Sequence, residues 1–409
     1  METVLEAELT PPAPPAPQPW NLRGLSVIAF AHGVSDFYGG IIPITIFLVL
    51  SRQHISPAYQ GVLIFLWYLT SSIIQPFFGA YTDRHGRWWF MPTALACVMT
   101  SVSIAATVNS MWLLALLIVI GGVGSAVLHP EGGKYSAMLS GSRKATGISI
   151  FQIGGQLGYA LGPVAITLLY ARLGAGGSLW LLVPGTLGIV AIFTVMRRVA
   201  RSAAQVHGAA HTAVASNGSV DRVGVGLIMA STAIRHFTSG AFIAFLPNLL
   251  VARGFSIPAF GEVVTAFLLV STFGLFAGGY LSDRYGPVRI SIGALCGAVP
   301  FLFGFFAIPG PIGILSLLIA SVLLAVQNAP GVSIVQAMLP RNLGMALGLM
   351  NGVAFGAGSA AVAGIGIVVA QLGAATALES VSVMPLVAAL AYVLVGNRVP
   401  SLRARSAPG

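Results

Sequence analysis

Long apolar segments separated by short polar connections run through almost the whole chain of 409 residues. An α-helix needs about 20 apolar residues to cross a lipid bilayer, and the segments have this length. The pattern predicts twelve transmembrane helices, at about 24–50, 57–81, 88–108, 111–138, 145–171, 178–197, 224–250, 258–281, 288–308, 311–338, 343–371 and 378–397. We therefore expect an all-α membrane protein.

The composition agrees with a chain that is surrounded by lipid, because 56% of its residues are hydrophobic and only 7% are charged. Soluble domains carry about 25% charged residues, so a soluble enzyme is excluded. The 50 glycines are typical of membrane helices that pack closely. The two cysteines, Cys97 and Cys296, lie in apolar segments and predict neither a disulfide nor a metal site.

The net charge of +10 comes from basic residues that lie between the apolar segments and alternate between the two sides of the membrane. If the N-terminus is cytoplasmic, 15 Lys and Arg fall on the cytoplasmic side, and only Arg52, Arg172 and Arg253 fall on the other. This is the positive-inside pattern, so we expect both termini in the cytoplasm and no nucleic-acid partner.

The chain divides into two halves that repeat each other. The expected parts are a disordered tail, a first bundle, a polar linker, a second bundle and a second tail, at 1–22, 23–197, 198–223, 224–397 and 398–409. The repeat has an offset of 200 residues, so that Pro130 recurs as Pro330 and Gly158 as Gly358. Parallel six-helix repeats of this kind place a substrate site near the bilayer midplane, between the halves.

The connection after the second predicted helix reads Gly79-Ala-Tyr-Thr-Asp83-Arg84-His-Gly86-Arg87, and it recurs as Gly279, Asp283, Arg284 and Gly286. This resembles the cytoplasmic signature of the major facilitator superfamily, Gly-x-x-x-Asp-Arg-x-Gly-Arg. The resemblance implies a major facilitator fold, with twelve helices in two six-helix pseudo-repeats, and a monomer. It also implies that the loop residues latch the halves together as a gate; anchoring by positive charge is the alternative. The gate candidates are Gly79, Asp83, Arg84, Gly86, Arg87, Asp283 and Arg284.

A narrower resemblance rests on three strings in the first half. They are Ala31-His32-Gly-Val-Ser35-Asp36, Leu128-His129-Pro130-Glu131 and Phe151-Gln152-Ile153-Gly154-Gly155-Gln156. This set is similar to the fosmidomycin resistance family, which are proton-driven drug exporters of bacterial inner membranes. The resemblance implies proton-coupled export through a bacterial inner membrane, without a cofactor.

Asp36 is the first candidate for proton coupling, because it lies about half-way along the first predicted helix. A charge near the bilayer centre costs at least roughly 2.5 kcal/mol and normally faces a cavity or a partner. His32 and Ser35 lie one helical turn before Asp36, on the same face. A protonatable site is one interpretation, and a structural hydrogen-bond cluster between helices is the other.

Arg235 and His236 lie half-way along the seventh predicted helix and match Ser35 and Asp36 in the repeat. The planar guanidinium of arginine suits a phosphonate or a carboxylate. Arg235 could instead pair with Asp36 in the empty state, or belong to a permanent structural ion pair. The substrate-binding candidates are Arg235, His236, Gln152, Gln156, Asn351 and Ser35.

Glu131 and Lys134 are three residues apart on the fourth predicted helix and therefore share a face. Glu131 is either a second protonatable carboxylate or part of a local ion pair near the cytoplasmic interface. His129 points roughly away from Glu131, and we expect it to form a hydrogen bond with a neighbouring helix. Pro130 should kink the helix, because proline removes a backbone hydrogen bond.

The fifth predicted helix carries Gly154, Gly158 and Gly162 at intervals of four, followed by Pro163. These residues make a smooth groove for a neighbouring helix. The series resembles the antiporter motif of the superfamily, although Ile166 and Thr167 replace its final glycine pair. Close packing alone explains the ladder equally well.

No phosphate-binding loop and no zinc-protease motif occur, so ATP is not the direct energy source and no enzyme is expected. The sequence thus favours proton-coupled export of a small anionic or polar compound, similar to fosmidomycin, by alternating access. The partners would be the small molecule, protons and the bilayer. The alternative is a proton symporter or facilitator that imports a small organic acid or metabolite.

Overall fold

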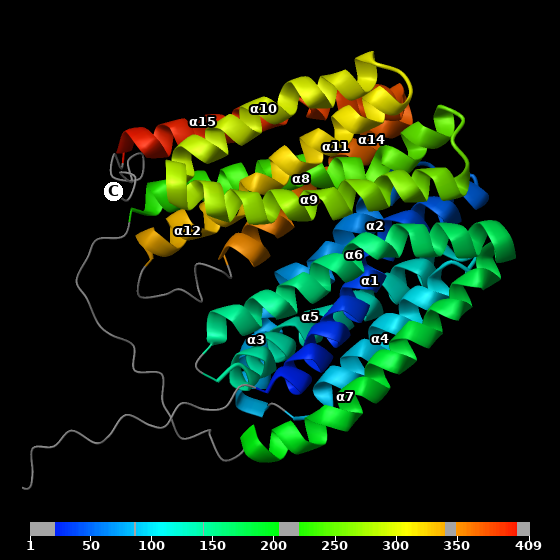
Figure 1. The fold of residues 1–409 in the computed structure, drawn as a ribbon. Helices are drawn as coiled ribbons and strands as arrows, with labels where there is room; N and C mark the ends of the chain where they lie inside the picture. The colour runs from blue at the N-terminus through cyan, green and yellow to red at the C-terminus, as the bar shows by residue number, and fades with distance from the viewer. Residues whose placement is uncertain (1–20, 86, 142, 204–220, 340–348, 399–409) are drawn as a thin grey trace, which may run out of the picture.

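The computed structural model describes residues 21–85, 87–141, 143–203, 221–339 and 349–398, and within them every regular element is a helix. The first half of the chain contains α1 (Leu22–Arg52), α2 (Ala58–Tyr68), η1 (Leu69–Ile73), α3 (Gln75–His85), α4 (Phe90–Ala105), α5 (Met111–Leu139), α6 (Lys144–Leu173), η2 (Gly174–Leu181) and α7 (Leu182–Ala203). The second half contains α8 (Arg222–Ala252), α9 (Ile257–Tyr285), α10 (Pro287–Ala307), α11 (Pro311–Val326), α12 (Asn328–Met338), η3 (Leu349–Ala354), α14 (Phe355–Val381) and α15 (Met384–Arg398). The two halves lie side by side as bundles of long helices (Figure 1).

Nine helical stretches in the described part of the chain are long and apolar enough to cross a bilayer. Two of them, Thr146–Val195 and Gly352–Arg398, are 50 and 47 residues long, and each contains two successive helices. The helix α4 is apolar but shorter, with 16 residues. These observations are consistent with the twelve predicted spans.

The boundaries differ from the prediction where a helix is interrupted inside an apolar segment. The second span consists of α2, the π-helical turn η1 and α3, and the tenth is divided between α11 and α12. The helix α7 continues to Ala203, six residues into the predicted linker at 198–223. The helix α14 contains Gly373, whose φ of 83° interrupts the helical backbone. Hydropathy averages over a whole segment, so it cannot detect a local change in the backbone.

The helices α1 and α6 lie in backbone-to-backbone contact. A Cβ atom at Gly154 would overlap the carbonyl group of Ala29, and one at Gly158 would overlap the carbonyl group of Gly33. The glycine ladder on α6 therefore fits directly against α1, as small residues allow in membrane helices. The two helices form a single packed unit within the first half.

The two halves meet near one face of the molecule. We call this the loop face; it carries the connection between α1 and α2 and the connection between α8 and α9. There Gln60 Nε2 donates to the Ala244 carbonyl at 2.5 Å, and Val164 N donates to Thr265 Oγ1 at 3.0 Å. The opposite face, the tail face, contains the start of α8 and the end of α15, which are joined by an ion pair of 3.6 Å between Asp221 and Arg398.

Replacing Gly261 with leucine should separate the halves at the loop face. Gly261 on α9 lies so close to the side chain of Thr167 on α6 that any Cβ atom would overlap it. We expect a longer distance between spin labels at positions 54 and 252, measured by pulsed electron paramagnetic resonance. The matched control is Gly293→Leu on α10, where no atom would meet the added Cβ. An unchanged label distance in Gly261→Leu would contradict this view of the contact.

Candidate functional site

A cavity of about 440 Å³ lies between the two halves. Small-molecule sites in proteins usually measure about 300–1,000 Å³, so this cavity is large enough for a metabolite or a drug. Its polar lining from the first half includes His32, Asp36, Tyr68, Gln75, His129, Gln152, Gln156 and Tyr159. The second half contributes Arg235, His236, Ser239, Ser271, Asn328 and Ser359. Asp36 is the single carboxylate among the described lining residues.

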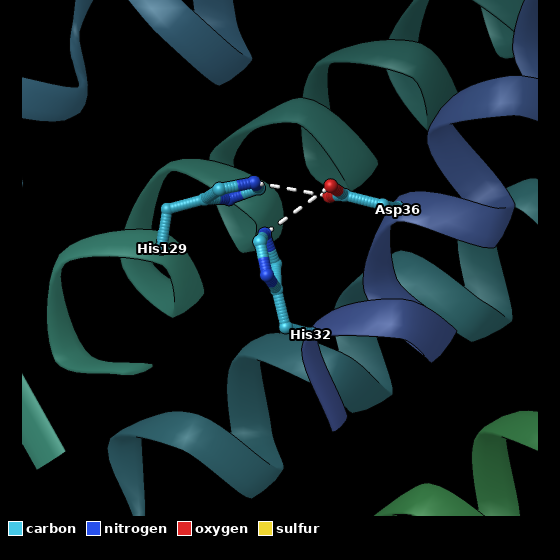
Figure 2. A group of neighbouring side chains, drawn as sticks. All are labelled: His32, Asp36 and His129. Carbon is cyan, nitrogen blue, oxygen red and sulfur yellow. Dashed lines mark ion pairs between the residues drawn. The ribbon is translucent and has the colours of Figure 1, made fainter. Parts of the chain in front are cut away.

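Asp36 is held between two histidines (Figure 2). Its Oδ2 atom lies 3.2 Å from His32 Nε2, and its Oδ1 atom lies 3.0 Å from His129 Nε2. His32 is one turn before Asp36 on α1, whereas His129 comes from α5. The predicted pair of His32 and Asp36 is thus joined by a histidine from another helix, and we call the three residues the acid–histidine cluster.

Backbone carbonyl groups fix the orientation of both imidazole rings. His32 Nδ1 lies 2.8 Å from the Phe151 carbonyl oxygen, and His129 Nδ1 lies 2.8 Å from the Ser125 carbonyl oxygen. The ring of Phe151 also stacks on His32, with centroids 3.8 Å apart. Because a carbonyl oxygen can only accept, each Nδ1 carries the hydrogen, and each Nε2 is directed at Asp36.

The ligand atoms of the acid–histidine cluster lie within 4.8 Å of one another, a spacing that a metal ion could bridge. The same atoms already contact each other directly at hydrogen-bonding distances. We therefore describe the cluster as two ion-pair contacts of Asp36 and assign no metal to it. The expectation from the sequence that no metal site exists stays a prediction.

Arg235 is the main cation on the wall formed by the second half. Its side chain is buried, and Nη2 donates to Asn328 Oδ1 at 2.8 Å and to His236 Nε2 at 2.5 Å. None of the ion pairs in the described part of the chain includes Arg235, and its Nε has no hydrogen-bond partner. The guanidinium is a buried positive charge at the wall of the cavity, and no described carboxylate forms an ion pair with it. Burial of this kind is costly unless a charged partner is supplied.

A sequence model of the Major Facilitator Superfamily matches residues 26–222 and 228–409, which is nearly the whole chain. The chain belongs to the major facilitator superfamily. It is therefore a multi-pass membrane transporter that binds small molecules, and not an enzyme. The predicted fold class is confirmed.

Two curated bacterial proteins resemble this major facilitator protein over most of their length. One is the fosmidomycin resistance protein of Escherichia coli, which is 26% identical over 378 residues, or 91% of this chain and 93% of the relative. The other is the uncharacterized MFS-type transporter YfnC of Bacillus subtilis, which is 27% identical over 388 residues with the same coverage. The predicted resemblance to the fosmidomycin resistance family is thus confirmed.

A solved structure has the same fold at much lower identity. The crystal structure of a bacterial homolog of the human lysosomal transporter Spinster, in an inward-facing and unoccupied conformation, aligns with a TM-score of 0.69. It is 15% identical, and the alignment covers 95% of this chain and all of the other.

Several predicted site residues of this major facilitator protein lie away from the cavity. Ser35 is buried but does not line it, because Ser35 and Asp36 point in directions about 100° apart on the helix. The carboxylate of Glu131 is fully buried outside the cavity wall, with Lys134 Nζ 3.9 Å from Oε1. The predicted pair of Asp36 and Arg235 is not formed, since each has the other partners described above.

The remaining predicted residues fall into three groups. Gln152 and Gln156 line the cavity, as does His236. The gate candidates Arg84, Arg87, Asp283 and Arg284 are exposed at the tail face, and Gly79 approaches Pro130. Gly86 and the side chains of Asp83 and Asn351 lie outside the described residues.

Sequence reasoning left two residues out of the site that the structure brings into it, although it expected His129 to contact a neighbouring helix. Asn328 holds Arg235, and His129 completes the acid–histidine cluster. Both lie within two residues of the repeated prolines Pro130 and Pro330. The repeat could have identified them, because Pro130 and Pro330 occupy matching positions in the two halves.

Proposed function

We propose that this transporter exports a small anionic compound from the bacterial cytoplasm across the inner membrane, driven by protons that enter through the same cavity. The observation that carries the proposal is a cavity with the acid–histidine cluster on one wall and, on the other, an arginine that has no ion-pair partner among the described residues. The arginine would hold the anion, and the cluster would hold the protons.

The substrate class follows from Arg235. Its Nη2 atom donates hydrogen bonds to Asn328 and His236, whereas its Nε atom has no hydrogen-bond partner. The guanidinium charge has no counterion among the described residues. An arginine fork binds a carboxylate, phosphonate or phosphate through two parallel hydrogen bonds. Gln152 and Gln156, on the opposite wall, can donate to further oxygens of the same molecule.

Proton coupling is assigned to Asp36 together with His32 and His129. Asp36 is partly accessible, and both of its oxygens contact an imidazole nitrogen. Histidine changes its charge near neutral pH, so such a cluster can take up and release protons as access alternates between the two sides. Glu131 stays a weaker candidate, because it is buried beside Lys134 and does not line the cavity.

The direction of transport rests on the similarity to the fosmidomycin resistance protein. The distribution of Lys and Arg supports a cytoplasmic tail face. The contacts between the halves near the loop face would then close the cavity from the periplasm in this conformation. A substrate from the cytoplasm would then enter from the tail face.

A second candidate function is symport of protons with a small organic acid. One observation favours it: protons on the cluster would remove negative charge from the cavity that contains Arg235. An anion would then bind more tightly to the protonated transporter, which favours movement of both in the same direction. Exchange of protons for substrate requires a different cycle, in which the transporter carries protons in one direction and the substrate in the other.

Proton flux in inverted membrane vesicles distinguishes these functions. With an acidic interior and a pH-sensitive dye, external fosmidomycin or another organic anion should collapse the gradient if the protein exchanges protons for substrate. Vesicles containing equal amounts of the Asp36→Asn variant are the control. Uptake coupled to protons in right-side-out vesicles would instead establish symport. If no compound in a broad panel moves protons in either orientation, proton-coupled transport is wrong.

A further inference from the structure

We propose that the transported compound is an amphiphilic anion, which places its charged group at Arg235 and an apolar group nearer the loop face. This inference rests on the proposed function, because it specifies the substrate class of the same cavity. Its basis is the order in which polar and apolar lining residues follow one another along four membrane spans.

The lining of the cavity changes from polar to apolar in the same direction in both halves. The helices α6 and α8 run towards the loop face, where Val164 of α6 contacts α9 and where α8 ends. On α8, Arg235 comes first and Ile243 lies nearer the loop face. On α6, Gln152 comes first and Tyr159 lies nearer the loop face. Each half thus contributes a polar residue followed by a less polar one.

Two spans that run in the opposite direction show the same change. On α2, which begins at the loop face, Trp67 and Tyr68 line the cavity before the serines and the glutamine of η1 and α3. On α9, Phe267 and Leu268 come before Ser271. The six residues nearest the loop face form what we call the apolar end: Trp67, Tyr68, Tyr159, Ile243, Phe267 and Leu268.

The apolar end offers few polar atoms to a substrate. Its six side chains carry two hydroxyl groups, one indole N–H and no charge. The hydroxyl groups of Tyr68 and Tyr159 lie 3.2 Å apart, so they can satisfy each other. The other two phenylalanines of the lining, Phe151 and Phe355, each lie against a histidine ring outside the apolar end. Moving an apolar group from water into this end is therefore favourable.

The distance between the charge and the apolar end sets the size of the substrate. Eight positions separate Arg235 from Ile243 on α8, which corresponds to about 12 Å along the helix axis. A very small anion held at Arg235 would leave the apolar end filled with water, whereas an anion with an extended apolar tail would reach it. The cavity volume of about 440 Å³ is sufficient for such a molecule.

The apolar end lies beside the hydrogen bonds that join the two halves. Ala244 and Thr265 accept these bonds, and they lie one and two residues from Ile243 and Phe267. Because the apolar end contains residues of both halves, an apolar tail in it would contact both halves close to the surface at which they meet. The tail should therefore influence transport as well as binding.

A series of alkylphosphonates tests the substrate class by binding alone. The purified protein in nanodiscs is titrated by calorimetry with methylphosphonate, butylphosphonate and hexylphosphonate, and empty nanodiscs correct for uptake into lipid. Each methylene group buried in the apolar end should raise the affinity about fourfold, so hexylphosphonate should bind at least roughly 10-fold more tightly than methylphosphonate. Equal affinities of these two phosphonates would overturn the proposal. Equally tight binding of hexyltrimethylammonium, which has the same tail and the opposite charge, would also overturn it.

An asparagine at Ile243 tests whether the apolar end is where the tail binds. Ile243→Asn should reduce the preference for hexylphosphonate over methylphosphonate, because the tail would then meet an amide. Ile243→Thr is a milder change that gives the same test if Ile243→Asn does not fold. Val251→Asn is the matched control, because Val251 lies on the same helix, is exposed and does not line the cavity. An unchanged preference in both Ile243 variants would contradict the assignment of the apolar end.

Proton flux in the vesicle assay separates this inference from the proposed function. Hexylphosphonate should collapse the gradient at lower concentration than methylphosphonate, and vesicles without the protein correct for passive permeation. Tail-dependent binding without any proton flux would contradict proton-coupled export and leave the substrate class in place. Equal flux with both phosphonates would overturn the amphiphilic substrate class while proton-coupled export stands.

Discussion

Replacing Asp36 with asparagine should reduce proton-driven transport to the level of vesicles without the protein, while the fold is retained. Asparagine has the same shape but cannot bind or release a proton near neutral pH. Its amide can still donate to one imidazole Nε2, so one of the two contacts that Asp36 makes with His32 and His129 can persist as a hydrogen bond. The loss would therefore report on proton transfer and not on packing.

The measurement for Asp36→Asn combines the vesicle flux assay with thermal unfolding of the purified protein. We expect the unfolding temperature to stay close to that of the wild type, because the amide has the same shape as the carboxylate and keeps one imidazole contact. Ser35→Ala is the matched control: Ser35 is the neighbouring residue, buried outside the cavity, and its loss should leave transport intact. Full proton-driven transport by Asp36→Asn would rule out this carboxylate as the coupling group.

Replacing Arg235 with glutamine should weaken binding of the anionic substrate roughly 10- to 100-fold. A hydrogen bond to a charged group contributes about 1.5–3 kcal/mol, and about 1.4 kcal/mol corresponds to a factor of ten in affinity. The glutamine amide ends near the position of Arg235 Nε, so it falls short of the Nη2 atom that contacts Asn328 and His236. Glutamine also lacks the positive charge and the two parallel N–H donors with which a guanidinium binds an anion.

The same substitution should make the empty transporter as stable as the wild type or more stable. The guanidinium is buried without a carboxylate among the described residues, so its removal relieves an unfavourable charge burial. Calorimetry would measure the affinity, and thermal unfolding with and without substrate would measure stability. Arg253→Gln is the control, because Arg253 lies at the loop face and contacts the rings of Phe305 and Phe306. Equal affinity of Arg235→Gln and the wild type would exclude Arg235 from the substrate site.

The sequence predicted the fold and several cavity residues because both depend on strong local signals. A polar or charged residue in the middle of an apolar segment is costly in lipid, so Asp36 and Arg235 had few alternatives to facing the cavity. The glycine ladder of α6 was similarly informative, since a groove of small residues requires a close neighbour, and that neighbour is α1. These inferences needed only hydropathy and helical spacing.

Hydropathy and helical spacing could not show which face of α5 lines the cavity. His129 and Glu131 are two residues apart and point in nearly opposite directions, so the rotation of the helix decides which one reaches Asp36. That rotation is set by packing against several neighbouring helices, α4 and α1 among them, and the local sequence does not encode it. We expected Glu131 to be the coupling candidate on α5, whereas the structure places His129 at the cavity. The π-helical turns η1 and η3 were missed for a related reason, because they change the backbone without changing hydropathy.

The acid–histidine cluster and the contacts that hold Arg235 each lie within one half of the molecule, although the cavity itself is lined by both. The acid–histidine cluster uses side chains of α1 and α5 and a carbonyl group of α6, and Arg235 is held by Asn328 from the adjacent α12. Under the proposed roles, the proton site and the arginine that binds the anion can therefore be altered separately. Selection for a new drug could remodel the second half while the first half keeps its proton chemistry, so the range of compounds exported could broaden without loss of the driving force.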